Sequence, residues 1–375
     1  MKSLFKSKGF GEVLRILIAI SIGLLLGFIV TLLVSDDPIN AYKAFLFGPL
    51  TRLNRIGDWL EESLTLILLG LAVSFVFSAK QFYIGVEGQM LLAAMVAGSV
   101  VLFVPLPPEL AIPLAFVAAM ATGFLYGLIP AILKAYLNAN ELVTSLMLNS
   151  VALKLFEFTL KTYIKPPDAG ALMSDHIPTA YRLSSFIPDW PFLAEARELW
   201  SKQTSLTYML YIVIAAVFIC YWLLYKTPFG YELRTVGSNI KFASYGGINV
   251  KRAIILSITV SGIFAGLAGV HLALAIHNKI VLGMSYGLGF EGINIAILAS
   301  NNPLAVPLAS LFYGYLRAGA DVMERSSDVS RELVTVVQAV VLLLVTAERL
   351  FPKLHQHFKA VKETDNIQEG ETNDA

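Results

Sequence analysis

The feature that most constrains this chain is a series of long apolar runs without charged residues. The first run, residues 16–34, would extend about 28 Å as a helix, which matches the hydrocarbon core of a bilayer. Hydrophobic residues make up 56% of the chain and charged residues only 15%, against roughly 25% charged in soluble domains. The pattern therefore predicts an all-α polytopic integral membrane protein. The further runs are residues 63–79, 88–108, 110–133, 142–153, 203–225, 253–276, 292–316 and 333–347.

The run over residues 292–316 is interrupted by Asn301-Asn302-Pro303. A proline in a helix interior removes a backbone hydrogen bond and clashes with the preceding turn, so we expect this run to form two short helices. With that division the sequence predicts about ten transmembrane helices.

The charge distribution predicts the orientation of these helices, because cytoplasmic connections of membrane proteins are rich in Lys and Arg. Residues 226–252 hold five basic residues and one acid, whereas residues 159–205 hold five of each. Ten spans place residues 226–252 and both termini in the cytoplasm and the loop 159–205 outside. We therefore predict a transmembrane domain over residues 1–362, integral to the bacterial cytoplasmic membrane. An acidic, disordered tail follows over residues 363–375.

Three short motifs occur twice in the same order: GVEG and GFEG, AIPLA and AVPLA, and ELVT in both copies. The predicted topology gives the two copies opposite orientations, so spans 2–5 and 7–10 are expected to be inverted repeats. Such repeats recur among transporters, where the substrate passes at the interface between them, and the pattern therefore favours transport. The motifs lie at residues 85–88 and 289–292, 111–115 and 305–309, and 141–144 and 332–335.

Polar residues in or beside the apolar runs are candidates for lining a substrate pathway. Glu87 and Glu291 occupy equivalent repeat positions. The simpler interpretation of each is an acid stabilised by the helix dipole in a first turn. The alternative is a pathway lining, because ionisable groups at membrane depth usually face a cavity. For polar residues near 142–153, hydrogen bonding between helices is equally open. The candidate set is Glu87, Gln89, Asn140, Glu141, Thr144, Asn149, Glu291 and Asn294.

Other motifs indicate packing rather than chemistry. His271 and His277 are six residues apart, which is not one helical face, so we predict no metal site and interpret both as satisfied or interfacial histidines. The motif Gly283-Met284-Ser285-Tyr286-Gly287 formally matches a hydrolase nucleophile elbow but lacks the strand–turn–helix context, and we predict no catalytic residue. Pairs of glycines four apart are interpreted as positions of close helix packing. They are Gly23 and Gly27, Gly123 and Gly127, and Gly262 and Gly266.

Two further absences in the sequence narrow the function. The chain has no phosphate-binding loop of the form G-x-x-x-x-G-K-[ST], so any ATP dependence must come from a partner chain. It has no run of Lys and Arg of the kind that follows a nucleic-acid backbone. We therefore expect no cofactor of its own and no nucleic-acid partner.

The basic segment 226–252 begins with Thr227-Pro228-Phe229-Gly230. Its apolar residues Leu233, Val236, Ile240 and Phe242 predict a brief amphipathic helix. Such a helix either rests on lipid or forms a docking surface for a cytoplasmic subunit.

Three blocks of sequence resemble a known family: residues 82–90 (FYIGVEGQM), 140–149 (NELVTSLMLN) and 227–249. On these blocks the chain resembles the membrane permease subunits of ABC importers in the ribose, branched-chain amino acid and nucleoside group. Within that group it is most similar to the permeases of nucleoside importers that work with basic-membrane-protein-type receptors.

The resemblance implies a transmembrane permease domain, and alternating access driven by ATP hydrolysis on a separate subunit, which would bind the ATP and Mg²⁺. The implied protein partners are a cytoplasmic ABC ATPase, an external solute-binding lipoprotein, and either a second homologous permease subunit or a second copy of this chain. The other implied partners are membrane lipid and a small polar substrate, for which the resemblance favours a nucleoside. It also implies a coupling loop that meets the ATPase. The residues assigned to that loop are Thr227, Phe229, Gly230, Arg234, Gly237, Gly246 and Gly247.

Two alternatives remain open from the sequence. A secondary transporter driven by an ion gradient fits inverted repeats equally well, although it would not need the basic coupling segment. A permease for a monosaccharide such as ribose fits the same family group.

Overall fold

The computed structural model describes residues 21–29, 31–33, 35–187 and 204–329, with positions 335, 336, 339, 340 and 343. Within these ranges the chain is helical and forms no strand. Two isolated β-bridges, Met173 with Val281 and Ser185 with Thr207, are the extended pairings of this part. The all-α prediction is therefore confirmed for the described residues.

The described residues include six helices that are long and apolar enough to cross a membrane, so the chain is a polytopic membrane protein. The full count of ten spans and the inverted repeats stay predictions, and the last predicted span, residues 333–347, lies largely outside the described residues. The six helices are α3 Leu53–Ser78, α4 Val86–Phe103, α5 Pro108–Leu137, α6 Glu141–Thr159, α8 Met209–Lys226 and α11 Val250–His271; π-helical turns extend α6 to Ile164 and α11 to Ile276.

The predicted break in the run 292–316 is confirmed. Helix α12, Leu288–Leu298, ends before the Asn-Asn-Pro sequence, and α13, Val306–Ser326, begins after it. Asn301 takes a left-handed conformation with φ of 58°, which asparagine tolerates better than most residues. The Asn302 side chain accepts a hydrogen bond from the Leu304 backbone N–H. These asparagines therefore form the turn that separates the two helices.

One predicted boundary differs from the structure. The second span was expected from Ser63, where the charge-free run starts, but α3 begins at Leu53. The additional turns contain Asp58, Glu61 and Glu62. The carboxylate of Asp58 accepts from the Ser205 hydroxyl at 2.8 Å, and Glu61 is hydrogen-bonded to Thr207 and to His271 of α11. Because these acids have partners, the helix continues through them.

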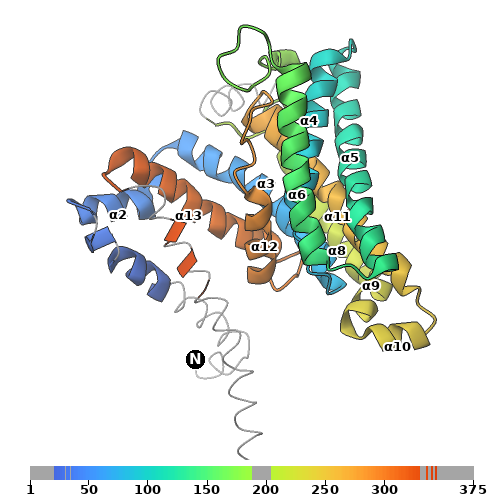
Figure 1. The fold of residues 1–375 in the computed structure, drawn as a ribbon. Coiled ribbons are helices and arrows are strands. Elements are labelled where there is room, and N and C mark those ends of the chain that lie inside the picture. Colours follow the sequence, from blue (N-terminus) through green and yellow to red (C-terminus); the bar gives the residue numbers. More distant parts are fainter. Residues whose placement is uncertain are drawn as a thin grey trace, which may run out of the picture. The chain divides into compact units, whose positions relative to one another are not determined.

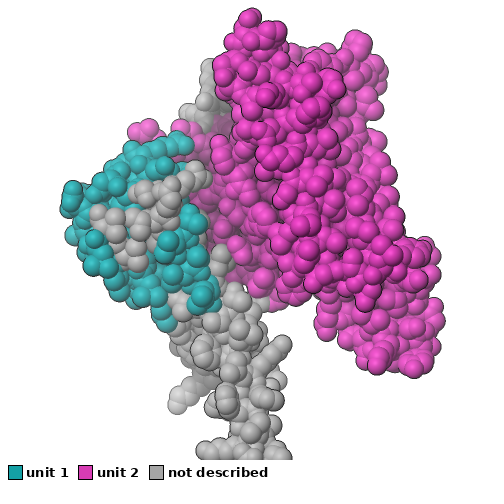
Figure 2. Space-filling view, viewed as in Figure 1, with its two compact units in different colours: residues 1–48, 319–375 teal, residues 49–318 magenta. Residues whose placement is uncertain are grey.

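The contacts divide the chain into two compact units, residues 1–48 with 319–375 and residues 49–318 (Figure 2). In the first unit, helix α2, Pro38–Phe47, is capped by Asp37, whose side chain accepts from the Asn40 backbone N–H. The Tyr42 hydroxyl donates to the Leu24 carbonyl at 2.6 Å. Ser35 donates its hydroxyl hydrogen to Asp328 at 2.6 Å, and this bond joins the two chain segments of the unit.

In the second unit α3, α4 and α11 are buried along most of their length, whereas α5, α6 and α8 expose much of theirs. Helices α4, α5, α6 and α11 stand side by side (Figure 1). Most exposed residues of α5 and α6 are apolar, as expected of surfaces that face lipid; they include Leu114, Val117 and Leu125 on α5 and Val143, Met147 and Val151 on α6. The exposed Glu109, Ser150 and Lys154 are polar.

Helices α5 and α11 pack through the predicted glycines. A Cβ atom built on Gly123 would collide with the Gly262 carbonyl, and one on Gly262 would collide with the Gly123 carbonyl. A Cβ on Gly266 would lie 2.6 Å from the Ala119 carbonyl oxygen. The interpretation of these pairs as positions of close backbone packing is therefore confirmed for α5 and α11.

Candidate substrate pathway and coupling segment

The two copies of the Gly-x-Glu-Gly motif meet at the N-termini of α4 and α12. Glu87, in the first turn of α4, accepts a hydrogen bond from the Gly289 backbone N–H at 2.6 Å, and its side chain is 9% exposed. A Cβ on Gly289 would lie 2.6 Å from the Glu87 backbone, so only glycine permits this approach. The Glu87 carboxylate therefore occupies the positive end of α12, where a negative charge is stabilised.

Glu291 has a different partner. Both its carboxylate oxygens accept from the Arg317 guanidinium of α13, at 2.8 and 3.0 Å, and Arg317 also lies 3.4 Å from the Glu62 carboxylate of α3. One turn along α12, Asn294 is hydrogen-bonded to Tyr313. We name Glu62, Glu291 and Arg317 the α12–α13 charge cluster; its side chains are 14% to 33% exposed.

Two members of this cluster, Glu62 and Arg317, were not predicted. Each adjoins an end of an apolar run, at Ser63 and at Leu316. Charges at those places look like the polar borders of a span, and nothing in the sequence pairs one with the other. The sequence therefore shows both charges, but does not distinguish them from the charges that ordinarily border a membrane span.

Gln89 lies at the junction of α4, α5 and α11 and is fully buried. Its side-chain amide donates to the carbonyls of Gly123 at 3.2 Å and Ile258 at 3.5 Å. Gly127 and Gly262 leave the space that the amide fills. The structure thus places Gln89 between packed helices, away from the α12–α13 charge cluster.

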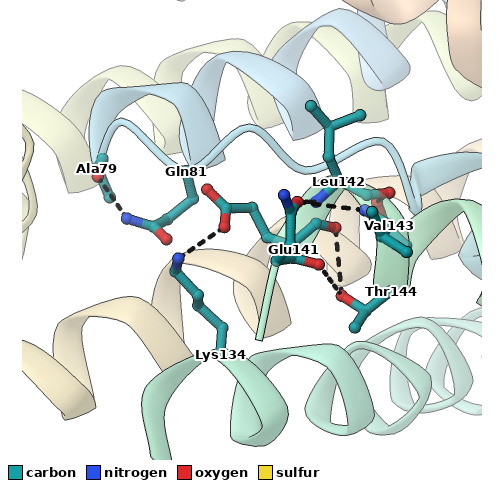
Figure 3. Close-up of polar contacts among 9 residues, drawn as sticks. Ala79, Gln81, Lys134, Glu141, Leu142, Val143 and Thr144 are labelled. Atoms are coloured by element: carbon teal, nitrogen blue, oxygen red, sulfur yellow. Dashed lines mark hydrogen bonds and ion pairs between the residues drawn. The ribbon is translucent and has the colours of Figure 1, made fainter. Parts of the chain in front are cut away.

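The candidates on α6 form two groups. Asn140 caps the helix by accepting from the Leu142 and Val143 backbone N–H groups, and Thr144 donates to the Asn140 carbonyl at 3.0 Å. Glu141 forms an ion pair with Lys134 at 2.7 Å across the α5–α6 connection (Figure 3). Asn149 lies two turns further along and binds the start of α4, as described below.

A buried polar network joins α3 and α11. The ring of His271 is fully buried, with Nε2 2.8 Å from Glu61 and Nδ1 2.7 Å from the Thr65 hydroxyl. Thr207 donates both its backbone N–H and its hydroxyl to the Glu61 carboxylate. His271 is thus a satisfied buried histidine, as predicted. No group of His, Cys, Asp or Glu in the described residues is arranged to hold a metal ion.

The basic segment folds into two short helices, α9 Pro228–Ser238 and α10 Ile240–Tyr245, where one was predicted. Leu233 and Val236 are buried on α9, whereas Ile240 and Phe242 belong to α10 and are exposed. Thr227 caps α9 by accepting from the Gly230 backbone N–H at 3.2 Å. A Cβ on Gly230 would collide with the carbonyls at the end of α8, and one on Gly237 with the Ser78 carbonyl at the end of α3. The two glycines therefore let α9 lie directly against the C-terminal ends of both spans.

Side-chain contacts also hold α9 against α3 and α8. Phe229 packs against Phe75 of α3, with ring centroids 6.0 Å apart. The Arg234 guanidinium lies 4.8 Å from the centroid of the Tyr225 ring on α8. The polar face of α9 and most of α10 remain exposed, including Phe242 and Tyr245, the latter 92% exposed.

Gly246 and Gly247 follow α10 at its C-terminal end. Gly246 caps α10, with its backbone N–H directed to the Phe242 carbonyl. Gly247 has a φ of 79°, which glycine adopts without steric cost. These residues form the turn between α10 and α11.

The sequence matches the family described as branched-chain amino acid transport system / permease component over residues 55–346. The chain belongs to this permease family. The matched range contains α4 and α12 with their glutamates, the whole of α6, and the basic segment 226–252. A permease is a transport component and not an enzyme. The family match and the ABC permeases among the relatives below confirm the prediction of an ABC permease subunit.

Individual relatives cover almost the whole permease. It is 32% identical to the guanosine ABC transporter permease protein NupP of Bacillus subtilis over 88% of this chain and 92% of that protein. It is 30% identical to the nucleoside ABC transporter permease protein NupB of Lactococcus lactis, over 94% and 96%. The glucose ABC transporter permease protein TsgB13 of Haloferax volcanii is 31% identical, over 91% and 88%. No solved structure matches the chain significantly.

Proposed function

We propose that this permease carries nucleosides across the cytoplasmic membrane by alternating access, driven by a separate ABC ATPase that binds ATP and Mg²⁺. The observation that carries the substrate class is the similarity to guanosine and nucleoside permeases over nearly the full length of the chain. A monosaccharide is the second candidate substrate, since the glucose permease of Haloferax volcanii is 31% identical.

The α12–α13 charge cluster supports a polar pathway beside α12. Charged side chains at membrane depth are costly unless they face protein or water. The carboxylates and guanidinium of this cluster are partly exposed in the single chain, whereas the exposed sides of α5 and α6 are mostly apolar. We infer that α5 and α6 face lipid and that the cluster faces the substrate route or a second permease subunit. In that arrangement Glu291 and Asn294 line the route.

The position of α9 supports its role in coupling. A helix pressed against the ends of α3 and α8 transmits displacement to both, because packed interfaces deform little. The exposed residues of α9 and α10 then form the surface for the ATPase. With residues 226–252 in the cytoplasm, as the positive charge predicts, both termini are cytoplasmic, and an external solute-binding lipoprotein meets the opposite side.

Uptake by the complete complex tests this function. The permease, its ATPase and its receptor protein are reconstituted in proteoliposomes, and uptake of radiolabelled guanosine is measured with ATP inside, with unlabelled nucleosides, glucose or branched-chain amino acids as competitors. We expect competition by nucleosides alone and no uptake with a hydrolysis-deficient ATPase. Absence of guanosine uptake, together with uptake of radiolabelled glucose in its place, favours the monosaccharide. Uptake that stops with a protonophore and persists without ATP identifies an ion-driven transporter and rejects the proposal.

A further inference from the structure

The connection between α3 and α4 is not helical. Residues 81–84 form no helix, strand or turn, and Lys80 before them has a left-handed φ of 51°. In a membrane protein, backbone N–H and C=O groups outside helices must find partners within the protein. For Ile84, and for Gly88 at the start of α4, these partners come from one helix, α6.

Three polar residues of α6 lie along the connection in order, and the last two bind its backbone. The Glu141 carboxylate lies near the Phe82 backbone. Ser145 accepts from the Ile84 backbone N–H at 3.2 Å. Asn149 donates to the Ile84 carbonyl and accepts from the Gly88 backbone N–H, both at 3.0 Å.

The spacing explains why the two segments match. Glu141, Ser145 and Asn149 are four residues apart, so they share one face of α6 and are separated by about 6 Å each. Two residues outside a helix can span up to about 6.6 Å, enough for Phe82 to lie beside Glu141 while Ile84 lies beside Ser145. We name these three residues the α6 clamp.

The connection held by the α6 clamp joins two contacts described above. At its beginning, Ser78 and Ala79 lie against Gly237 of α9. At its end, Glu87 binds the N-terminus of α12. Any displacement of α9 that moves the end of α3 therefore reaches the α4–α12 junction through residues that α6 holds.

We propose that Ser145 and Asn149 are positioning residues for transport: they hold residues 82–88 in one of the two states of the alternating-access cycle and release them in the other. This inference rests on the proposed function only for the existence of two states. The bonds suit a reversible contact, since they are few and neutral, and each changes an equilibrium by about two- to tenfold. A ligand such as ATP on a partner subunit shifts such an equilibrium by binding the two states differently.

Thiol labelling in the assembled complex tests the proposal. The one native cysteine, Cys220, is buried and is replaced by alanine. Ile84→Cys keeps the backbone groups that the clamp binds and supplies the probe. The rate of reaction with a membrane-impermeant maleimide is measured in the nucleotide-free and the vanadate-trapped complex, in backgrounds carrying Ser145→Ala, Asn149→Ala or the control Ser150→Ala. Ser150 lies on the same helix and donates to the Leu146 carbonyl of that helix.

With the clamp residues unchanged, we expect Ile84→Cys to be labelled at different rates in the nucleotide-free and the vanadate-trapped complex. Ser145→Ala and Asn149→Ala should raise the slower rate about two- to tenfold and leave the faster rate unchanged, so that the difference between the states shrinks. Ser150→Ala should change neither rate. If Asn149→Ala prevents assembly, Ser145→Ala, which removes a single hydroxyl, decides the outcome.

Three results overturn the proposal. The first is equal labelling of Ile84→Cys in both states when the clamp residues are unchanged. The second is that Ser145→Ala and Asn149→Ala label at the same rates as Ser150→Ala, and the third is that they raise the rate equally in both states, which indicates a merely structural contact. The proposed substrate fails separately. A complex that shows state-dependent labelling but takes up no nucleoside retains the clamp and refutes the nucleoside assignment.

Discussion

Replacing Glu87 should loosen the junction between α4 and α12 by an amount that the structure allows to be estimated. A hydrogen bond to a charged group contributes about 1.5–3 kcal/mol, and a carboxylate at a helix N-terminus adds about 0.3–1 kcal/mol. Glu87→Ala removes both, a loss of about 2–4 kcal/mol, and Glu87→Gln, which keeps an acceptor, should lose about half as much. Since about 1.4 kcal/mol is tenfold, local opening around Gly289 should increase on the order of a hundredfold in Glu87→Ala.

Hydrogen exchange of the Gly289 amide measures this opening, because that N–H is the donor to Glu87. The assay follows peptides that contain Gly289 in the detergent-solubilised complex, by mass spectrometry. Glu109→Gln is the matched control, since Glu109 also lies in the first turn of a long helix but is exposed. Exchange should accelerate in the order Glu109→Gln, Glu87→Gln, Glu87→Ala, with the control unchanged. Equal exchange at Gly289 in Glu87→Ala and the control would refute the reasoning.

Three further predictions concern packing, the buried network and the charge cluster. Gly262→Ala should separate α5 from α11 and lower the yield of folded protein in size-exclusion chromatography, whereas Gly246→Ala, where a Cβ finds ordinary contacts, should not; equal yields would contradict the close packing. His271→Leu should cost about 1–3 kcal/mol, since it takes a hydrogen-bond partner from the buried Glu61 carboxylate, and an unchanged thermal midpoint in detergent would mean that the network contributes little. Arg317→Gln should reduce uptake at least tenfold while the complex still assembles, and normal uptake kinetics would remove the cluster from the pathway.

The helical architecture followed from the sequence because charge-free runs of this length have few other solutions. The residues at which the helices end could not be predicted from the sequence. Helix α6 was expected to end at Leu153, before Lys154 and Glu157, yet these two side chains pair with each other at 2.9 Å and the helix continues to Thr159. Hydropathy counts a charge as a cost regardless of its partner, so it shortens every span whose charges are neutralised within the fold.

The candidate site was predictable in its residue types but not in its pairings. Asn149 and Glu141 were found because they are polar in an apolar run. Ser145 was missed, since a serine inside a helix commonly donates to a carbonyl of its own helix, and here it also accepts from Ile84. Its partner is a backbone group of a non-helical segment, and backbone groups have the same donors and acceptors whatever the residue, proline excepted. No pattern of side chains identifies such a partner.

The repeated glutamates show how far sequence equivalence extends into chemistry. Glu87 and Glu291 occupy the same place in the repeated motif, and the repeat alone suggests equal roles. The structure gives Glu87 a backbone N–H at the end of α12 and gives Glu291 a guanidinium on α13. The first contact depends on glycine at position 289, because a side chain there would collide with Glu87. The second depends on Arg317, which lies ten residues after Pro307 of the second AVPLA motif, whereas the residue ten after Pro113 of the matching AIPLA motif is Gly123, which carries no charge. A duplicated motif therefore fixes where an acid stands on its helix, while the neighbouring helices decide what that acid binds.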